Sequence, residues 1–236
     1  LLSRRQRQMC IRDRSDVYFT MGNVAAAQEM AFESNIGALC DGNPRMTQRL
    51  VQTNLIYGAY PVAEKYIAVL ENTFYYKDWA KAQRKFLYND EAVETDPLLG
   101  NMRRNLLAEN HLIQMDGFDT DLIRLAEQNP SNKAAFHYAG VFYLLAKDMT
   151  RFKTLVETYY GTDLLPSLPV SFQEAVIILS EKDPDYWKRF GVSESIVGRF
   201  TDYKRQVLAG RNNSNALPGL MYRSYGDTYW YYYMFK

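Results

Sequence analysis

The sequence predicts an all-α fold, in which antiparallel helix–turn–helix pairs pack one against the next and an aromatic C-terminal segment closes the array. Apolar residues recur with a helical period through most of residues 16–210, in segments rich in residues that favour helices. No sustained two-residue alternation and no hairpin turn between β-branched runs indicates a strand. A chain of 236 residues with 47% hydrophobic content is long enough to bury a core.

The helix pairs are predicted from a spacing that occurs three times. Tyr18, Gly22, Ala27 and Ala31 stand at offsets of four, five and four residues. The same offsets occur in two later sets, which are Asn54, Gly58, Ala63 and Ile67, and Tyr143, Lys147, Phe152 and Val156. Each set is interpreted as a helix, a tight turn at the Gly or Lys position and a second helix, because glycine adopts left-handed dihedrals without penalty.

This spacing resembles the tetratricopeptide repeat (TPR), which places Gly, Tyr, Ala and an aliphatic or aromatic residue at such offsets over about 34 residues. Gly140 and the third set give the best match, although Phe152 replaces the usual small residue. The first two sets lack the early glycine. The resemblance therefore implies a degenerate, TPR-like α-solenoid.

The pattern also predicts helices outside these sets. They lie at 79–89, 98–115 (bent near Asn110), 119–128, 171–180, 186–189 and 193–210. Asp119 or Thr120 is the expected N-cap of its helix, and Ser131 or Asn132 is expected to cap the helix that follows. The two prolines in 161–169 indicate a loop, which we interpret as lying within one array.

The N-terminal segment 1–14, LLSRRQRQMCIRDR, is treated separately from the domain at 15–210. It resembles translated sequencing-adaptor read-through, and we predict that it is non-native or disordered; the alternative is a basic arm that binds nucleic acid or anionic lipid. Without its five arginines and one aspartate, the rest of the chain has a net charge of −3, so nothing favours nucleic acid. Cys40 is then the one cysteine left, and it cannot form an internal disulfide.

No catalytic or metal-binding motif is present, and we expect no enzyme, no cofactor and no metal. The two histidines, His111 and His137, fit a helix end and an apolar helix face better than a ligand set. The sequence has no GxSxG elbow, P-loop, GxGxxG, HExxH or CxxC. A hydrolase with dispersed carboxylates remains the alternative, because such residues need not be close in sequence.

Two surfaces are candidates for binding a partner. The concave face of a TPR-like array binds peptides through polar residues of the first helices, and the candidates here are Arg49, Gln52, Asn54, Arg103, Arg104 and Asn105. The other candidate is the aromatic tail at 211–236, with Trp230 and Tyr232. We expect the tail to pack on the last repeat as a cap; a sugar- or peptide-binding patch and a membrane-interface belt are the alternatives.

Three stretches carry a further resemblance: VYFTMGNVAAAQEMAFESNI, NPRMTQRLVQTNLIYGAYPVAEKYI and the closing YGDTYWYYYMF. They look like an uncharacterised family of Bacteroidota membrane proteins with a domain of unknown function. The resemblance covers residues 15–236, and it implies a soluble, TPR-like C-terminal region preceded by transmembrane helices. It supplies no catalytic residues, and it leaves the side of the membrane open.

These observations favour a non-catalytic protein-interaction scaffold that binds a protein or peptide partner and no nucleic acid. No apolar run reaches the roughly 20 residues that span a bilayer, so the chain is expected to be soluble as given and membrane-associated only through an upstream region. The alternative is a glycan-binding module that uses the C-terminal aromatic cluster.

Overall fold

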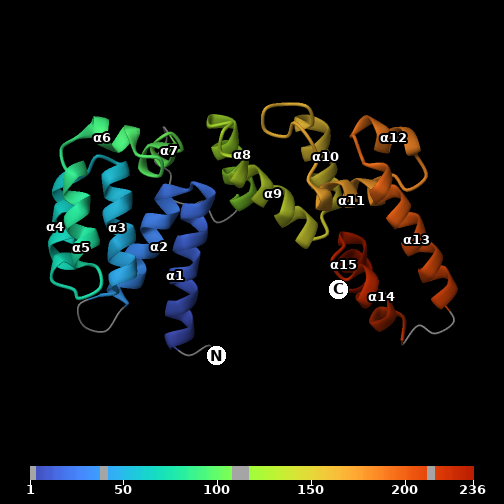
Figure 1. The fold of residues 1–236 in the computed structure, drawn as a ribbon, viewed down its shortest axis with the longest axis horizontal. Helices are drawn as coiled ribbons and strands as arrows, with labels where there is room; N and C mark the ends of the chain where they lie inside the picture. The colour runs from blue at the N-terminus through green and yellow to red at the C-terminus, as the bar shows by residue number, and fades with distance from the viewer. Residues whose placement is uncertain (1–3, 38–41, 108–116, 212–215) are drawn as a thin grey trace. The chain divides into compact units, whose positions relative to one another are not determined.

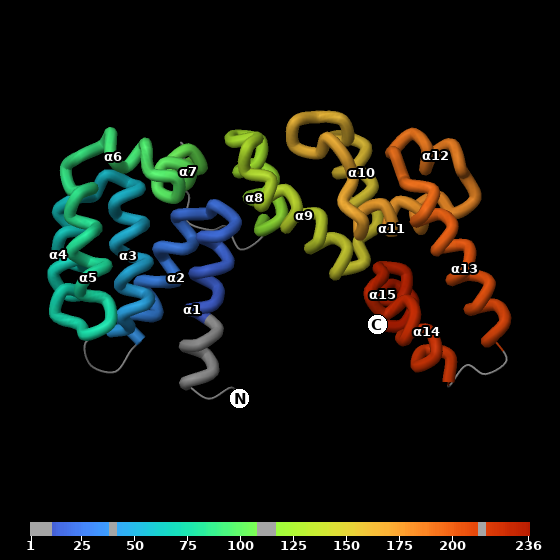
Figure 2. Tube along the Cα trace, viewed as in Figure 1, coloured from blue at the N-terminus to red at the C-terminus, as the bar shows by residue number. Residues whose placement is uncertain are grey.

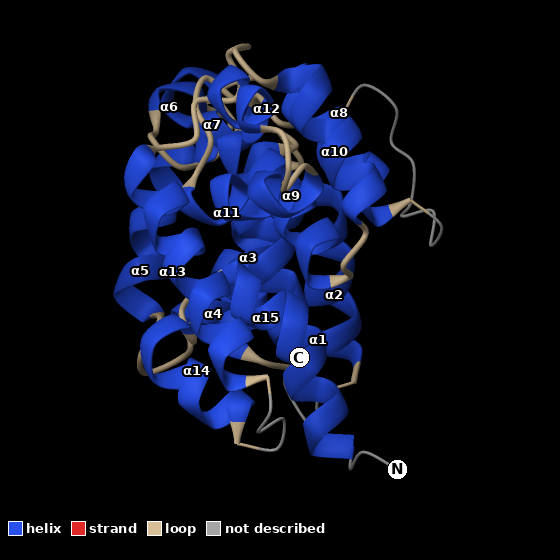
Figure 3. Ribbon diagram, turned by 90° about the vertical axis from the view of Figure 1, so that its right-hand side faces the viewer, coloured by secondary structure: helices blue, strands red, loops and turns tan. Residues whose placement is uncertain are grey.

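The computed structural model describes residues 4–37, 42–107, 117–211 and 216–236, with side chains from Ile11 onward. Every element in these ranges is a helix, so the predicted all-α class is confirmed (Figure 3). None of these helices is both long enough and apolar enough to cross a membrane. The chain divides into two compact units, Leu1–Phe136 and His137–Lys236, and each is described separately.

The first unit begins with four helices that alternate in direction (Figure 1). They are α1 (Arg4–Met21), α2 (Val24–Ile36), α3 (Pro44–Ile56) and α4 (Tyr60–Glu71). Each packs against the next along the chain, and α5 (Lys77–Gln83) packs against α4 (Figure 2). Ala27, Ala31 and Ala63 are fully buried between these helices. Such small side chains let the helix axes approach closely.

Short helices complete the first unit. They are the 3₁₀ helix η1 (Arg84–Phe86), α6 (Asp90–Thr95), α7 (Leu99–Arg103) and α8 (Phe118–Gln128). They are followed by α9 (Lys133–Leu145), within which the division between the units falls. Contacts of α7 with both α3 and α6 hold α6 and α7 against the first four helices.

In the described part of the second unit, six more helices follow α9. They are α10 (Met149–Tyr159), α11 (Val170–Leu179), α12 (Pro184–Arg189), α13 (Glu194–Gly210), α14 (Leu217–Tyr225) and α15 (Tyr229–Phe235). Its core joins α11 and α13 to the two C-terminal helices. The buried side chains of this core are Ile177, Phe200, Tyr203, Leu217, Met221, Tyr225, Trp230 and Tyr231.

All three turns predicted from the recurring spacing are confirmed. Gly22 has a φ of 86°, Gly58 a φ of 72° and Lys147 a φ of 55°, and each lies between two successive helices. A left-handed residue at this position lets the chain reverse directly after a helix. Lys147 is the costly member of the three, because its Cβ crowds the backbone in this conformation.

Two expected caps differ in outcome. Asn132 is confirmed as a cap of α9, since its Oδ1 accepts a hydrogen bond from the Ala135 N–H. Asp119 and Thr120 were wrong as N-caps, because α8 begins one residue earlier and Gly117 occupies the cap position. Both acidic residues of its first turn, Asp119 and Asp121, still lie where they favour the helix dipole.

The predicted helix at 98–115 was wrong for residues 104–107, because α7 ends at Arg103. The chain turns there, and Asn105 is buried and accepts a hydrogen bond from the Asn129 amide. The helix expected at 79–89 is split into α5 and η1. At the N-terminus α1 begins at Arg4, earlier than the domain start expected at Ser15. Cys40, Asn110 and His111 lie outside the described residues.

Candidate functional site

The first unit contains a groove of about 420 Å³ that opens between α2 and α4, with residues of α3 at its base. We call it the α2–α4 groove, and it is lined by Ala25, Gln28, Glu29, Phe32, Leu50, Asn54, Tyr57, Val62 and Tyr66. Its volume lies within the range of about 300–1,000 Å³ that is typical of ligand sites.

The groove arises from how three helices divide their faces. On α2, Ala27 and Ala31 point into the core. Residues on the other side of the helix, which include Phe32, therefore lie on its outer face. Val62 lies on the matching face of α4. Phe32 is 50% and Val62 40% exposed, while Leu50 of α3 forms a buried floor between them. The walls are therefore apolar and accessible.

Several polar groups of the groove have no hydrogen-bond partner among the residues that the structure describes. Asn54 Nδ2 donates to the Leu50 carbonyl at 2.7 Å, and a carbonyl can only accept, so this bond fixes the orientation of the amide. Among the described residues, none donates to Asn54 Oδ1, and none forms a hydrogen bond with the side chains of Gln28, Glu29, Tyr57 or Tyr66. Burial raises the pKa of the Tyr57 hydroxyl. Apolar walls with a few convergent polar groups are typical of binding sites.

Arg49 and Gln52, two of the predicted partner-binding residues, form a cluster with Asp16 of α1. Arg49 Nη2 lies 2.9 Å from Asp16 Oδ1, and Arg49 Nη1 donates to Gln52 Oε1 at 2.8 Å. The guanidinium also stacks on the Phe19 ring at 3.7 Å, and Arg45 binds the other oxygen of Asp16. These contacts join α1 to α3, so the cluster has an evident structural role.

Arg103 closes the C-terminal end of α3. Its Nε donates to the Ile56 carbonyl at 3.0 Å and its Nη2 donates to the Leu55 carbonyl at 3.1 Å, while Nη1 lies 2.8 Å from an oxygen of Asp90. A cation at this position satisfies carbonyls that no helical N–H reaches.

Of the other predicted residues, Arg104 is exposed and Asn105 is only 2% exposed. Asn54 lines the α2–α4 groove. The structure thus brings Arg49 and Gln52 together and places Asn54 in the groove, but it does not gather the six on one open face. Four other residues of the groove were not predicted from the sequence; they are Gln28, Glu29, Phe32 and Tyr66.

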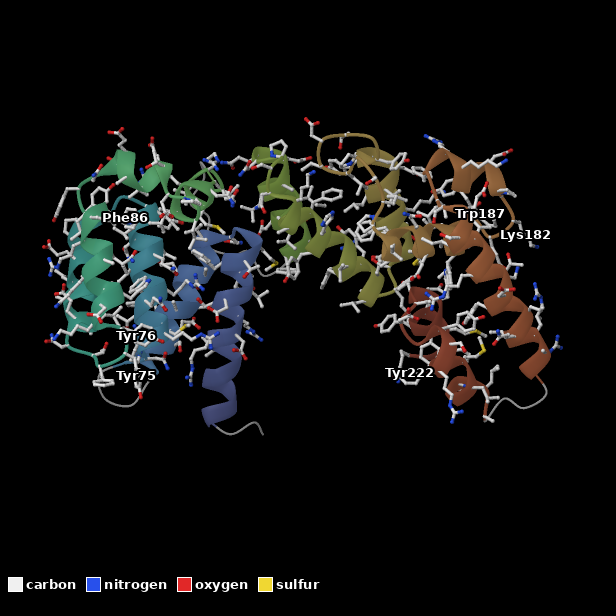
Figure 4. All side chains as sticks on the ribbon, in the orientation of Figure 1. Tyr75, Tyr76, Phe86, Lys182, Trp187 and Tyr222 are labelled. Atoms are coloured by element: carbon white, nitrogen blue, oxygen red, sulfur yellow. The ribbon has the colours of Figure 1, made fainter. Side chains whose placement is uncertain are left out.

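The C-terminal aromatics are largely covered. Trp230 is 1% exposed, and its Nε1 donates to the Glu174 carbonyl at 2.8 Å. The Glu174 carboxylate accepts a 2.7 Å hydrogen bond from the Tyr229 N–H at the start of α15. Tyr232 is half-buried, and its hydroxyl donates to the Leu145 carbonyl at 2.8 Å. Tyr222, labelled in Figure 4, remains 62% exposed.

Other groups considered for chemistry give no site in the parts of the chain that the structure describes. No three His, Cys, Asp or Glu side chains there are grouped as a metal site would require. The His137 ring packs edge-on against Phe172, with ring centroids 6.2 Å apart. This contact agrees with its interpretation as a residue at the edge of the core.

Comparison with known proteins assigns the chain to a family. No curated protein and no solved structure matches the chain. One family model matches residues 2–236, a range that takes in nearly all of the N-terminal segment 1–14. The chain belongs to this family, DUF6057, which is described as a family of unknown function.

Proposed function

We propose that the chain is a non-catalytic interaction scaffold that binds a segment of a partner protein in the α2–α4 groove. The observation that carries the proposal is the combination of half-exposed apolar walls with polar groups that have no partner in the described part of the chain. An exposed side chain such as Phe32 gains free energy when a partner covers it, and unused hydrogen-bonding groups fix the partner's register.

The helix pairs support a TPR-like arrangement within this proposal, because the three predicted turns follow that spacing. The resemblance to membrane proteins extends it to a scaffold held near a membrane by a part of the protein outside this sequence. A glycan-binding tail is less well supported, since a sugar stacks on an accessible ring face and Trp230 is covered.

The proposal is tested by selecting binders for the intact chain from a random peptide display library. Val62→Asp places a charge in the groove wall, and we expect it to abolish binding of the enriched peptides. Val17→Asp is the matched control, because Val17 lies on α1 and is 43% exposed, against 40% for Val62. Failure to enrich any peptide, or equal binding by both variants, would refute the groove as a binding site.

A further inference from the structure

Resting on the proposed function, we infer that the α2–α4 groove selects a polypeptide segment that carries an arginine beside apolar side chains. The reason is the charge of the groove. Among the described residues that line the groove, Glu29 is the one carboxylate, and none is a lysine or an arginine. Glu33 lies one turn further along α2, exposed and on the same side of the helix.

Glu29 differs from those carboxylates of the first unit that form ion pairs within the fold. Asp16 is held by Arg45 and Arg49. Glu64 and Glu71 both pair with Arg84, and Asp90 and Glu94 both pair with Arg103. No cation of the described residues forms an ion pair with Glu29. Its charge is therefore available to a ligand.

The other polar groups of the groove can bind the same ligand. Asn54 Oδ1 can only accept, and the Gln28 amide oxygen and the hydroxyls of Tyr57 and Tyr66 can also accept. A groove that combines a carboxylate with several acceptors suits a donor that carries many N–H groups. Guanidinium has five such donors in one plane, whereas lysine has three on a point charge, so arginine fits better.

The apolar walls suit the rest of such a segment. The hydrocarbon stem of an arginine can lie along Phe32 while its head reaches Glu29, and the planar head can stack on the Tyr66 ring. Neighbouring apolar residues of the segment would then cover Val62 and the remaining wall. An acidic segment is excluded, because it would bring a like charge against Glu29 in a partly desolvated place.

The inference is tested with the peptides enriched on the intact chain. We expect them to share an arginine next to apolar residues. Fluorescence anisotropy should then show that Glu29→Gln weakens binding by about tenfold, as expected for loss of a charge-assisted hydrogen bond. Glu91→Gln is the control, since Glu91 is exposed on α6 outside the groove, and it should leave affinity within about twofold.

Charge reversal separates a direct contact from a folding defect. Glu29→Lys should reject the arginine peptide and should bind its Arg-to-Glu version more tightly than the wild-type chain does. Thermal unfolding followed by circular dichroism checks that each variant is folded. Enriched peptides that lose affinity with Val62→Asp but carry no basic residue would overturn the charge inference and leave the groove standing. If no peptide is enriched, the groove itself is not a peptide site, and both proposals fall.

Discussion

Replacing Trp230 by alanine should strongly destabilise the second unit. The indole is 1% exposed, and it packs against Phe200 and Tyr203 with ring centroids 5.1 and 5.9 Å away. Trp-to-Ala changes in cores cost about 3–5 kcal/mol, because apolar contact is lost and a cavity remains. The change also removes the hydrogen bond to the Glu174 carbonyl. We expect a loss of about 4 kcal/mol in the free energy of unfolding.

Urea unfolding of the full chain, followed by far-ultraviolet circular dichroism, measures this loss. Where the two units unfold in separate transitions, only one transition should move. Tyr222→Ala is the control, because Tyr222 belongs to the same tail and is 62% exposed, and it should cost less than about 1 kcal/mol. Equal small losses for both variants would show that the tail is not a packed cap, and they would return Trp230 to the candidate binding surface.

Three further changes test the backbone and the buried charge. Gly22→Ala should lower the free energy of unfolding by at least about 1–2 kcal/mol, because φ is positive and the new Cβ would lie 2.5 Å from the Asn105 amide nitrogen. An unchanged melting temperature would contradict the left-handed conformation of this turn. Lys147→Gly should stabilise by about 0.5–1 kcal/mol by relieving a left-handed lysine; a loss of stability in urea unfolding would show that the contacts of the Lys147 ammonium with the Tyr232 and Tyr233 rings outweigh this strain. Burial raises the pKa of Glu174 above its ordinary value of 4.5, so its contribution to stability is present below pH 4.5 and is lost as pH rises through the folded pKa. Glu174→Gln should remove that pH dependence in urea titrations, and an unchanged pH profile would contradict the assignment.

The helix pairs could be predicted because their signals are local. A glycine after an apolar helix and a small residue one turn into the next helix specify the reversal within a few positions. Gly22 and Gly58 both take the expected conformation, and Lys147 does so despite its side chain. The end of α7 could not be predicted in this way, because neither glycine nor proline follows Arg103 before Gly117.

The structural roles of Arg49 and Arg103 could not be predicted either, because they depend on contacts between distant parts of the sequence. Arg49 meets Asp16 of another helix, and Arg103 meets the carbonyls at the end of α3. Neither partner is near in sequence. Polar residues that look available on a helix face in the sequence therefore form hydrogen bonds and ion pairs within the fold. The groove could not be located either, since its walls come from α2 and α4, two helices that are not consecutive in the chain, with α3 as the floor. Phe32 and Ile36, one turn apart on α2 and outside its alanine stripe, were the signal available in the sequence.

That stripe also gives the energetic basis for the proposed binding. On α2, alanines occupy the core while Phe32 and Ile36 remain 50% and 69% exposed. Burying one large apolar side chain completely contributes about 1.5–3 kcal/mol, and α2 forgoes much of this gain in the isolated chain. A partner that covered Phe32 and Val62 would recover part of it, while the Glu29 charge would add selectivity more than affinity. Apolar contact would thus supply most of the affinity for the segment, and the Glu29 carboxylate would determine the specificity. Val62→Asp should therefore abolish binding of every ligand, whereas Glu29→Lys should change which ligand is bound.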